Sequence, residues 1–119
     1  MGNPFVHIEL HTQDLEKSKK FYNDLFDWKM EEIPGQEYTI INVGEGTGGG
    51  LMVNPIPDAL DHWLPYILVD DVAAAARKAV SLGAAMVQDR TEVPDMGWYS
   101  VLVDPFGVSF GLWQPKMAS

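Results

Sequence analysis

The sequence contains no cysteine and only eight basic residues among its 119. Without cysteine, disulfide bonds, thiolate catalysis and Cys-ligated zinc are all excluded. Seventeen acidic residues leave a formal net charge of -9, which repels nucleic-acid phosphates and anionic lipids. No apolar run approaches the length of a membrane-spanning helix, and the first residues lack the basic flank and apolar stretch of a secretion signal. We therefore expect a cytoplasmic protein that binds neither nucleic acid nor membrane.

Apolar side chains are plentiful. Hydrophobic residues make up 46% of the chain, which includes four Trp, five Phe and four Tyr. This share is sufficient for a packed interior and too high for a disordered chain. The length fits one compact domain better than two separate cores. We predict a single domain over residues 1–119.

The first half of the chain predicts a strand, a helix and three further strands. Residues 5–11 alternate between apolar and polar side chains, as expected of a half-buried strand. Asp14 can cap the helix that follows. The helical spacing of apolar residues predicts a buried stripe formed by Leu15, Ser18, Tyr22, Leu25 and Phe26. Strands are then expected over residues 28–33, 37–43 and 50–54.

The second half predicts the same order of elements. A strand over residues 65–69 leads to a helix over residues 72–82, which Asp70 or Asp71 caps and Gly83 ends. Three strands follow, with a loop between the first and the second; the expected ranges are 84–88 for the first strand, 89–97 for the loop, 98–103 and 109–114. Both halves therefore predict a β-α-β-β-β unit.

The two halves also match at several individual positions. At an offset of 61 positions Tyr38 aligns with Tyr99, and glycines and a leucine align further on: Gly46 with Gly107, Gly50 with Gly111, Leu51 with Leu112. Self-similarity at a fixed offset indicates a duplicated unit.

We call the halves module one, about residues 4–55, and module two, about residues 64–115; residues 56–63 form the linker. The predicted fold class is α+β, with two tandem βαβββ modules forming a curved mixed sheet or half-barrel. The helices are expected on the outer face, because each first strand has an apolar row suited to pack under a helix.

A polar row lies on the first strand. His7, Glu9 and His11 occupy alternate positions about 6.5 to 7 Å apart, so they point to one side. Because Ile8 and Leu10 suit the helix-covered side, the polar row is expected to face the concave side of the sheet. Two imidazoles and a carboxylate can bind a divalent metal, act as a general acid/base pair, or simply line a pocket. His62, isolated in the linker, is expected at the surface.

Three segments resemble the vicinal oxygen chelate superfamily, which holds glyoxalase I, extradiol dioxygenases, and bleomycin- and fosfomycin-resistance proteins. They are HIELHTQDLEKSKKFYNDLFDW (7–28), YILVDDVAAAARKAVSLGA (66–84) and DPFGVSFGLWQP (104–115). Within the superfamily, the end of the first segment and GLWQP look most like the glyoxalase-like hydroxylase and antigen subgroup.

The resemblance implies four metal-ligand positions, one on the first and one on the last strand of each module. His7 matches the first position, whereas the others are Leu64, Gly50 and Gly111. Leucine and glycine side chains carry no ligand atom, and one imidazole cannot supply the three or four ligands of a catalytic metal. No cofactor is therefore expected, and metal-dependent glyoxalase or dioxygenase activity is disfavoured. A divalent metal would require Glu9 and His11 to join His7, or symmetry-related ligands from a second chain.

Resemblance to the metal-free resistance proteins implies a hydrophobic groove for a small, partly aromatic organic ligand, often completed in a homodimer. His7, Glu9 and His11 would supply its polar contacts. Aromatic walls stack on flat ligands and methionine adapts to irregular ones, so the expected wall residues are Met52, Trp63, Tyr66, Trp98 and Trp113. The alternative is a lyase, isomerase or dioxygenase-like enzyme that uses the polar row as acid/base groups or as a partial metal site.

Overall fold

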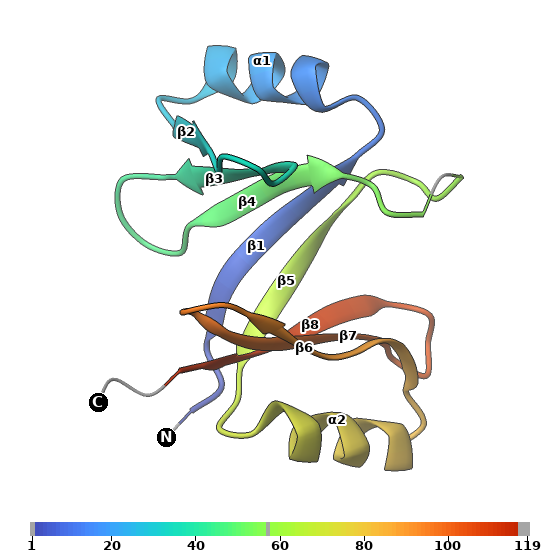
Figure 1. The fold of residues 1–119 in the computed structure, drawn as a ribbon. Helices are drawn as coiled ribbons and strands as arrows, with labels where there is room; N and C mark the ends of the chain where they lie inside the picture. The colour runs from blue at the N-terminus through green and yellow to red at the C-terminus, as the bar shows by residue number, and fades with distance from the viewer. Residues whose placement is uncertain (1, 57, 117–119) are drawn as a thin grey trace. The chain divides into compact units, whose positions relative to one another are not determined.

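The computed structural model describes residues 2–56 and 58–116 and divides the chain into two compact units (Figure 1). One unit comprises residues 7–64, and the other comprises residues 1–6 and 65–119. Module one contains β1 (Phe5–Thr12), α1 (Leu15–Leu25), β2 (Lys29–Glu32), β3 (Tyr38–Asn42) and β4 (Gly49–Val53). Module two contains β5 (His62–Leu68), α2 (Val72–Ser81), β6 (Ala85–Val93), β7 (Gly97–Val103) and β8 (Ser109–Pro115). The predicted α+β fold of two βαβββ modules is confirmed.

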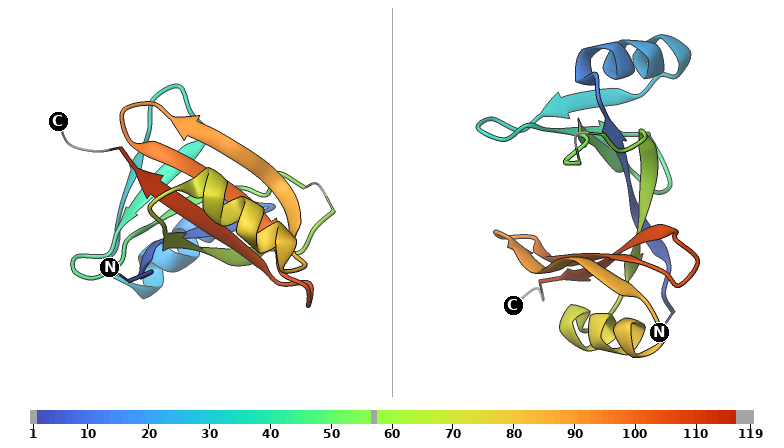
Figure 2. Two further views of the ribbon diagram at one scale, coloured as in Figure 1. Left: turned by 90° about the horizontal axis from the view of Figure 1, so that it is seen from below. Right: turned by 90° about the vertical axis from the view of Figure 1, so that its right-hand side faces the viewer.

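The two modules have the same sheet topology. In module one the strand order is β2-β3-β4-β1, and in module two it is β6-β7-β8-β5. The last three strands of each module form an antiparallel meander, and the first strand joins it parallel to the last one. Each module is therefore a mixed sheet, with its helix on one face (Figure 2).

Short polar side chains begin both helices. The Asp14 carboxylate accepts the Lys17 backbone N–H at 3.1 Å, and the Asp71 carboxylate accepts that of Ala74 at 3.1 Å. Asp71, rather than Asp70, is thus the cap of α2. Gly83 follows α2 at φ +107, a left-handed conformation that ends a helix and favours glycine.

The core of module one lies between α1 and the sheet. Leu10, Ile41 and Leu51 are buried, and Leu15 and Tyr22 of α1 pack on them. The predicted stripe was wrong at its end, because Leu25 and Phe26 remain 58% and 43% exposed. The helix stops at Leu25 and the chain is already extended at Phe26, so helical spacing no longer sets the direction of that side chain.

Two element boundaries differ from the prediction by more than one residue. The expected loop over residues 89–97 is strand as far as Val93, because β6 continues as an exposed, irregular partner of β7 with shifts in register. Its polar DRTE sequence resembles a loop, since an exposed edge strand needs no apolar face. β5 begins at His62, inside the predicted linker, and continues through Pro65. No helix within the described ranges is long and apolar enough to cross a membrane.

Candidate functional site

The polar row lies on the face of β1 that α1 does not cover. In the parallel pairing with β4, Glu9 lies beside Gly50 and His11 beside Met52. Leu10, between them, points into the α1 core. Glu9 and His11 are each 7% exposed, so the row is largely desolvated. The predicted separation of an apolar and a polar face of this strand is confirmed.

A continuous chain of hydrogen bonds joins the row. Glu9 Oε1 lies 2.7 Å from His11 Nε2, and the Tyr38 hydroxyl donates to Glu9 Oε2 at 2.7 Å. The same hydroxyl lies 2.6 Å from His7 Nε2. A phenol has one proton, which goes to Glu9, so His7 Nε2 must carry a proton and donate to Tyr38. The order is therefore His7 to Tyr38 to Glu9, with His11 donating to the other Glu9 oxygen.

This environment sets the charge of the row. Burial opposes ionisation of Glu9, but the hydrogen bonds from His11 and Tyr38 outweigh it and hold the pKa of Glu9 below its usual range. Burial lowers the pKa of His7, although the Glu9 carboxylate acts in the opposite direction. At neutral pH the row thus presents an ionised carboxylate beside a neutral imidazole.

Sequence reasoning missed Tyr38 as a member of the site. Its ring starts on β3, opposite Met52, and lies over Gly50 of β4. A Cβ atom built at residue 50 would overlap the Tyr38 hydroxyl, so only glycine leaves room for this side chain. The repeated tyrosine, Tyr38 and Tyr99, was the signal in the sequence that could have pointed to it.

His62 also belongs to this region, contrary to the expectation of an isolated surface residue. Its ring centroid lies 4.9 Å from that of His11, in an edge-on contact. The segment before it is held at the end of β1, because the backbone N–H of Gln13, directly after that strand, donates to Asp61 Oδ1 at 2.9 Å. His62 Nδ1 donates to the Leu60 carbonyl at 2.9 Å. The contacts with His11 and Gln13 join segments distant in the sequence and bring the imidazole to the row.

The predicted wall residues do not all share one face. Met52 lies beside His11 on the polar face. Trp63 instead lies on the α1 side, with its ring 5.5 Å from Tyr22. It lines a cavity of about 400 Å³ together with Trp28, Ile8 and Ile41.

In module two the β7–β8 pairing places the aromatic candidates on opposite faces. Tyr66 lies beside Gly111, and Trp113 pairs with Tyr99, so these side chains share the face away from α2. Trp98 pairs with Gln114 and therefore points the other way. Two cations lie over the Trp98 ring, Arg90 at 5.0 Å and Lys116 at 5.4 Å. Trp98 and Trp113 cannot line one surface.

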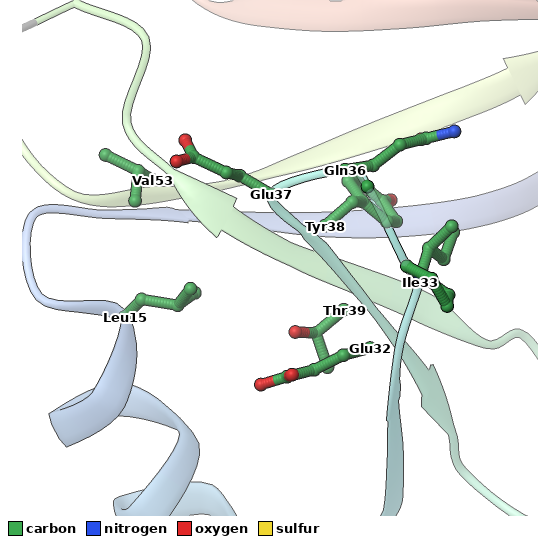
Figure 3. A pocket seen from close by; sticks show the side chains of 10 residues that line it. Leu15, Glu32, Ile33, Gln36, Glu37, Tyr38, Thr39 and Val53 are labelled. Carbon is green, nitrogen blue, oxygen red and sulfur yellow. The ribbon is translucent and has the colours of Figure 1, made fainter.

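A second cavity, of about 460 Å³, lies at the β2–β3 turn (Figure 3). Glu32, Gln36, Glu37 and Tyr38 contribute polar walls, and Leu15 and Val53 contribute apolar ones. Neither this cavity nor the one beside Trp63 includes the His7, Glu9 and His11 row. Cavity volume alone therefore does not identify the region of module one where the ionisable side chains of the polar row lie.

The donor set does not fit the divalent metal of the superfamily. Of the four implied ligand positions only His7 carries a ligand atom, and the Tyr38 and Tyr66 rings cover Gly50 and Gly111. Among residues 2–56 and 58–116, no three or more His, Asp or Glu side chains are arranged to hold a metal ion. The residues present therefore do not form the metal site that the resemblance implies.

Comparison with known proteins shows which proteins this chain is similar to. Residues 4–44 match the family described as bleomycin resistance protein-like N-terminal. The protein named "Putative glyoxylase CFP32" from Mycobacterium bovis is 34% identical over 110 residues, which cover 90% of this chain. In these matches the chain is similar to bleomycin-resistance-like and glyoxalase-like proteins, in line with the resemblance of its motifs to the vicinal oxygen chelate superfamily. It spans only 42% of the length of that relative, and the Mycobacterium tuberculosis protein of the same name matches equally.

Solved structures show that the fold of this chain occurs in other proteins. A hypothetical protein of Bacillus halodurans superposes with a TM-score of 0.68 at 17% identity, covering 100% of this chain and 99% of its own. Methylmalonyl-CoA epimerase from Mycobacterium tuberculosis gives a TM-score of 0.66 at 17% identity, covering 95% and 88%. At such identities the likeness concerns the fold.

Proposed function

We propose that this chain is a binding protein that holds a small, partly aromatic organic molecule on the polar face of β1, without a metal ion. The observation that carries the proposal is the hydrogen-bonded chain of His7, Tyr38, Glu9 and His11. Its members hydrogen-bond to one another, so the buried polar groups are satisfied without a metal ion. His7 is the most accessible, with its side chain 35% exposed against 10% for Glu9 and 9% for His11. We expect the ligand to touch His7, with Met52 nearby.

In module two, Tyr66 and Trp113 remain predicted ligand contacts, because both lie on the face of that module's sheet that α2 does not cover. We further propose that the protein is cytoplasmic and that it forms a homodimer. The homodimer is supported by Phe21 and Leu25 of α1, which are each 58% exposed, because apolar residues gathered at a surface often mark an interface.

Ligand binding is testable by tryptophan fluorescence against a panel of small aromatic compounds. We expect quenching or a spectral shift that Trp113→Phe removes. Trp98→Phe is the matched control, because Trp98 lies on the opposite face of the same strand pair and its loss should leave the response intact. If no compound changes the fluorescence of the unaltered protein or competes in ligand-observed NMR, the binding proposal fails.

Metal independence needs a separate measurement. We expect elemental analysis of the purified protein to show no stoichiometric divalent metal, and we expect chelators to leave ligand binding unchanged. A stoichiometric metal that His7→Ala removes would contradict the metal-free proposal.

The competing function is proton transfer on a carbonyl compound. It is favoured by the chain of titratable groups and by the name of the mycobacterial relative, which calls that protein a glyoxylase. His7 is the better base in this version, because Glu9 is hydrogen-bonded through both oxygens and its pKa is lowered. Exchange of α-protons for deuterium in small carbonyl compounds, followed by NMR, would detect it. Exchange that His7→Ala abolishes would favour the enzyme over the binding protein.

A further inference from the structure

One side chain of module one crosses a neighbouring strand to reach the polar row. Tyr38 lies on β3, Glu9 lies on β1, and β4 runs between them. The crossing takes place at Gly50, which is beside Glu9 in the β1–β4 pairing. A Cβ atom at residue 50 would overlap the hydroxyl and the ring carbons of Tyr38. Tyr38 can therefore contact Glu9 and His7 only because residue 50 has no side chain.

We propose that Tyr38 is a positioning residue of the ligand site and that Tyr38 and Gly50 act as a matched pair, which takes the place of the metal ligand implied at residue 50. The ligand part of this inference rests on the proposed binding function. The pair itself is a property of the protein without ligand.

The chemistry of the pair follows from the hydrogen bonds. A metal ion would attract the Glu9 carboxylate and the His7 lone pair; the phenol instead donates to Glu9 Oε2 at 2.7 Å and accepts from His7 Nε2 at 2.6 Å. His7 Nε2 and Glu9 Oε2 are 3.9 Å apart, beyond direct hydrogen-bond distance, so Tyr38 bridges them. Tyr38 therefore selects the Nε2–H tautomer of His7 and fixes which atoms His7 turns toward a ligand.

A tyrosine ring that covers a glycine is not specific to module one. Tyr66 covers Gly111, where a Cβ atom would overlap ring carbons, and Tyr66 meets Tyr99 edge-on with centroids 6.2 Å apart. A tyrosine over a closing-strand glycine thus occurs twice. The bridge from an imidazole to a carboxylate belongs to Tyr38.

The direct test uses the full chain with ¹⁵N-labelled histidine and long-range ¹H–¹⁵N NMR, which distinguishes the two imidazole tautomers. We expect His7 to be Nε2-protonated in the unaltered protein. Tyr38→Phe should shift His7 toward a mixture with the Nδ1–H form, because the acceptor is lost. Tyr22→Phe is the matched control, since it removes a hydroxyl from module one on the α1 side and should leave the His7 signals unchanged.

Gly50→Ala tests the pair without removing the phenol. The added methyl should displace Tyr38 and produce the same tautomer change, and the double variant Tyr38→Phe, Gly50→Ala should show little more than either single change. If His7 keeps its tautomer in a folded Tyr38→Phe or Gly50→Ala protein, the inference is overturned.

Ligand binding separates this inference from the proposed function. For any aromatic compound that binds, both variants should weaken the affinity by about tenfold, the effect of losing one ordered hydrogen bond at the site. If no compound binds the unaltered protein, the binding proposal fails while the tautomer experiment still decides the role of Tyr38. Unchanged affinity in both variants would show that Tyr38 does not position the ligand site.

Discussion

The two modules have the same backbone topology and a tyrosine at the same position, yet that tyrosine meets different partners. Tyr38 of module one contacts Glu9, which lies beside Gly50. Tyr99 of module two contacts Tyr66, which lies beside Gly111 and so takes the place of Glu9. At this position the first strand carries a carboxylate in module one and a phenol in module two, so the tyrosine of the third strand joins a polar row in one module and an aromatic pair in the other.

The two helices also differ, in how deeply their side chains are buried. Val72 and Ala76 of α2 are 0% and 2% exposed, whereas no residue of α1 is fully buried. The small side chains of the alanine-rich α2 allow close packing on the sheet. Module two therefore contributes more of its helix to the core, and module one contributes the ionisable site.

The largest expected effect tests the packing of module two. Leu102 is 0% exposed and packs with Val72 and Ala76 of α2. Leu102→Ala should lower the free energy of unfolding by about 2 to 5 kcal/mol, because it removes buried methyl groups and leaves a cavity. Urea unfolding followed by circular dichroism measures it. Leu25→Ala on the exposed side of α1 is the control and should change stability by less than about 0.5 kcal/mol. Equal losses in the two variants would contradict the difference between the helices.

The paired tyrosines give the next largest effect. Tyr38→Phe should destabilise the protein by about 1 to 3 kcal/mol, because it removes a hydrogen-bond donor to the buried Glu9 carboxylate. Tyr99→Phe keeps the ring that meets Tyr66 and should change stability by less than about 0.5 kcal/mol. Thermal or urea unfolding of the two variants side by side measures this comparison. Similar losses of stability in the two variants would contradict this difference between the modules.

A lower pH should destabilise the protein through groups in module one. The folded-state pKa values of His7 and Glu9 are both lowered, so the unfolded chain binds more protons and stability falls as the pH falls. The His7 contribution is complete above about pH 6.5 and is lost as the pH drops below it; the Glu9 contribution is lost below about pH 4.3. His7→Ala should therefore flatten the pH dependence of unfolding between about pH 7 and 5. An unchanged slope would exclude His7 as its source.

The smallest effect concerns a buried hydroxyl of module two. Ser100 is 0% exposed, and its Oγ makes no hydrogen bond to any described residue. Ser100→Ala should leave stability unchanged or raise it by up to about 1 kcal/mol, because it removes an uncompensated desolvated group. Differential scanning calorimetry can measure the difference in stability between Ser100→Ala and the unaltered protein. A clear loss of stability would mean that the hydroxyl has a partner in solution.

Local patterns predicted most of the fold. The alternation in residues 5–11, the aspartates before both helices and Gly83 after α2 correspond to physical requirements that operate within a few residues, so β1, α1 and α2 lie where expected. β6 was misjudged because an exposed edge strand carries the same polar residues as a loop. The end of the α1 stripe failed because helical spacing says nothing about where the chain leaves the helix.

The site was only half visible in the sequence. His7, Glu9 and His11 share a face because strand geometry requires it, and the glycines at 50 and 111 were evident as missing ligands. Tyr38 and His62 reach the row from β3 and β5, and no spacing rule connects residues 29 or 51 positions apart. Likewise, the faces of Trp63, Trp98 and Trp113 depend on strand pairing, which sequence alternation alone left unassigned.

By itself the sequence determined the duplicated βαβββ units, the polar row and the loss of most metal-ligand positions, since these follow from short-range periodicity and from side-chain chemistry. Only the tertiary structure decided what fills those positions. A glycine on β4 lets a tyrosine from β3 reach a carboxylate on β1, and that contact depends on strand order and on the absence of one Cβ atom. Long-range steric fit of this kind is set by packing, and so the residue that closes the site appeared only in three dimensions.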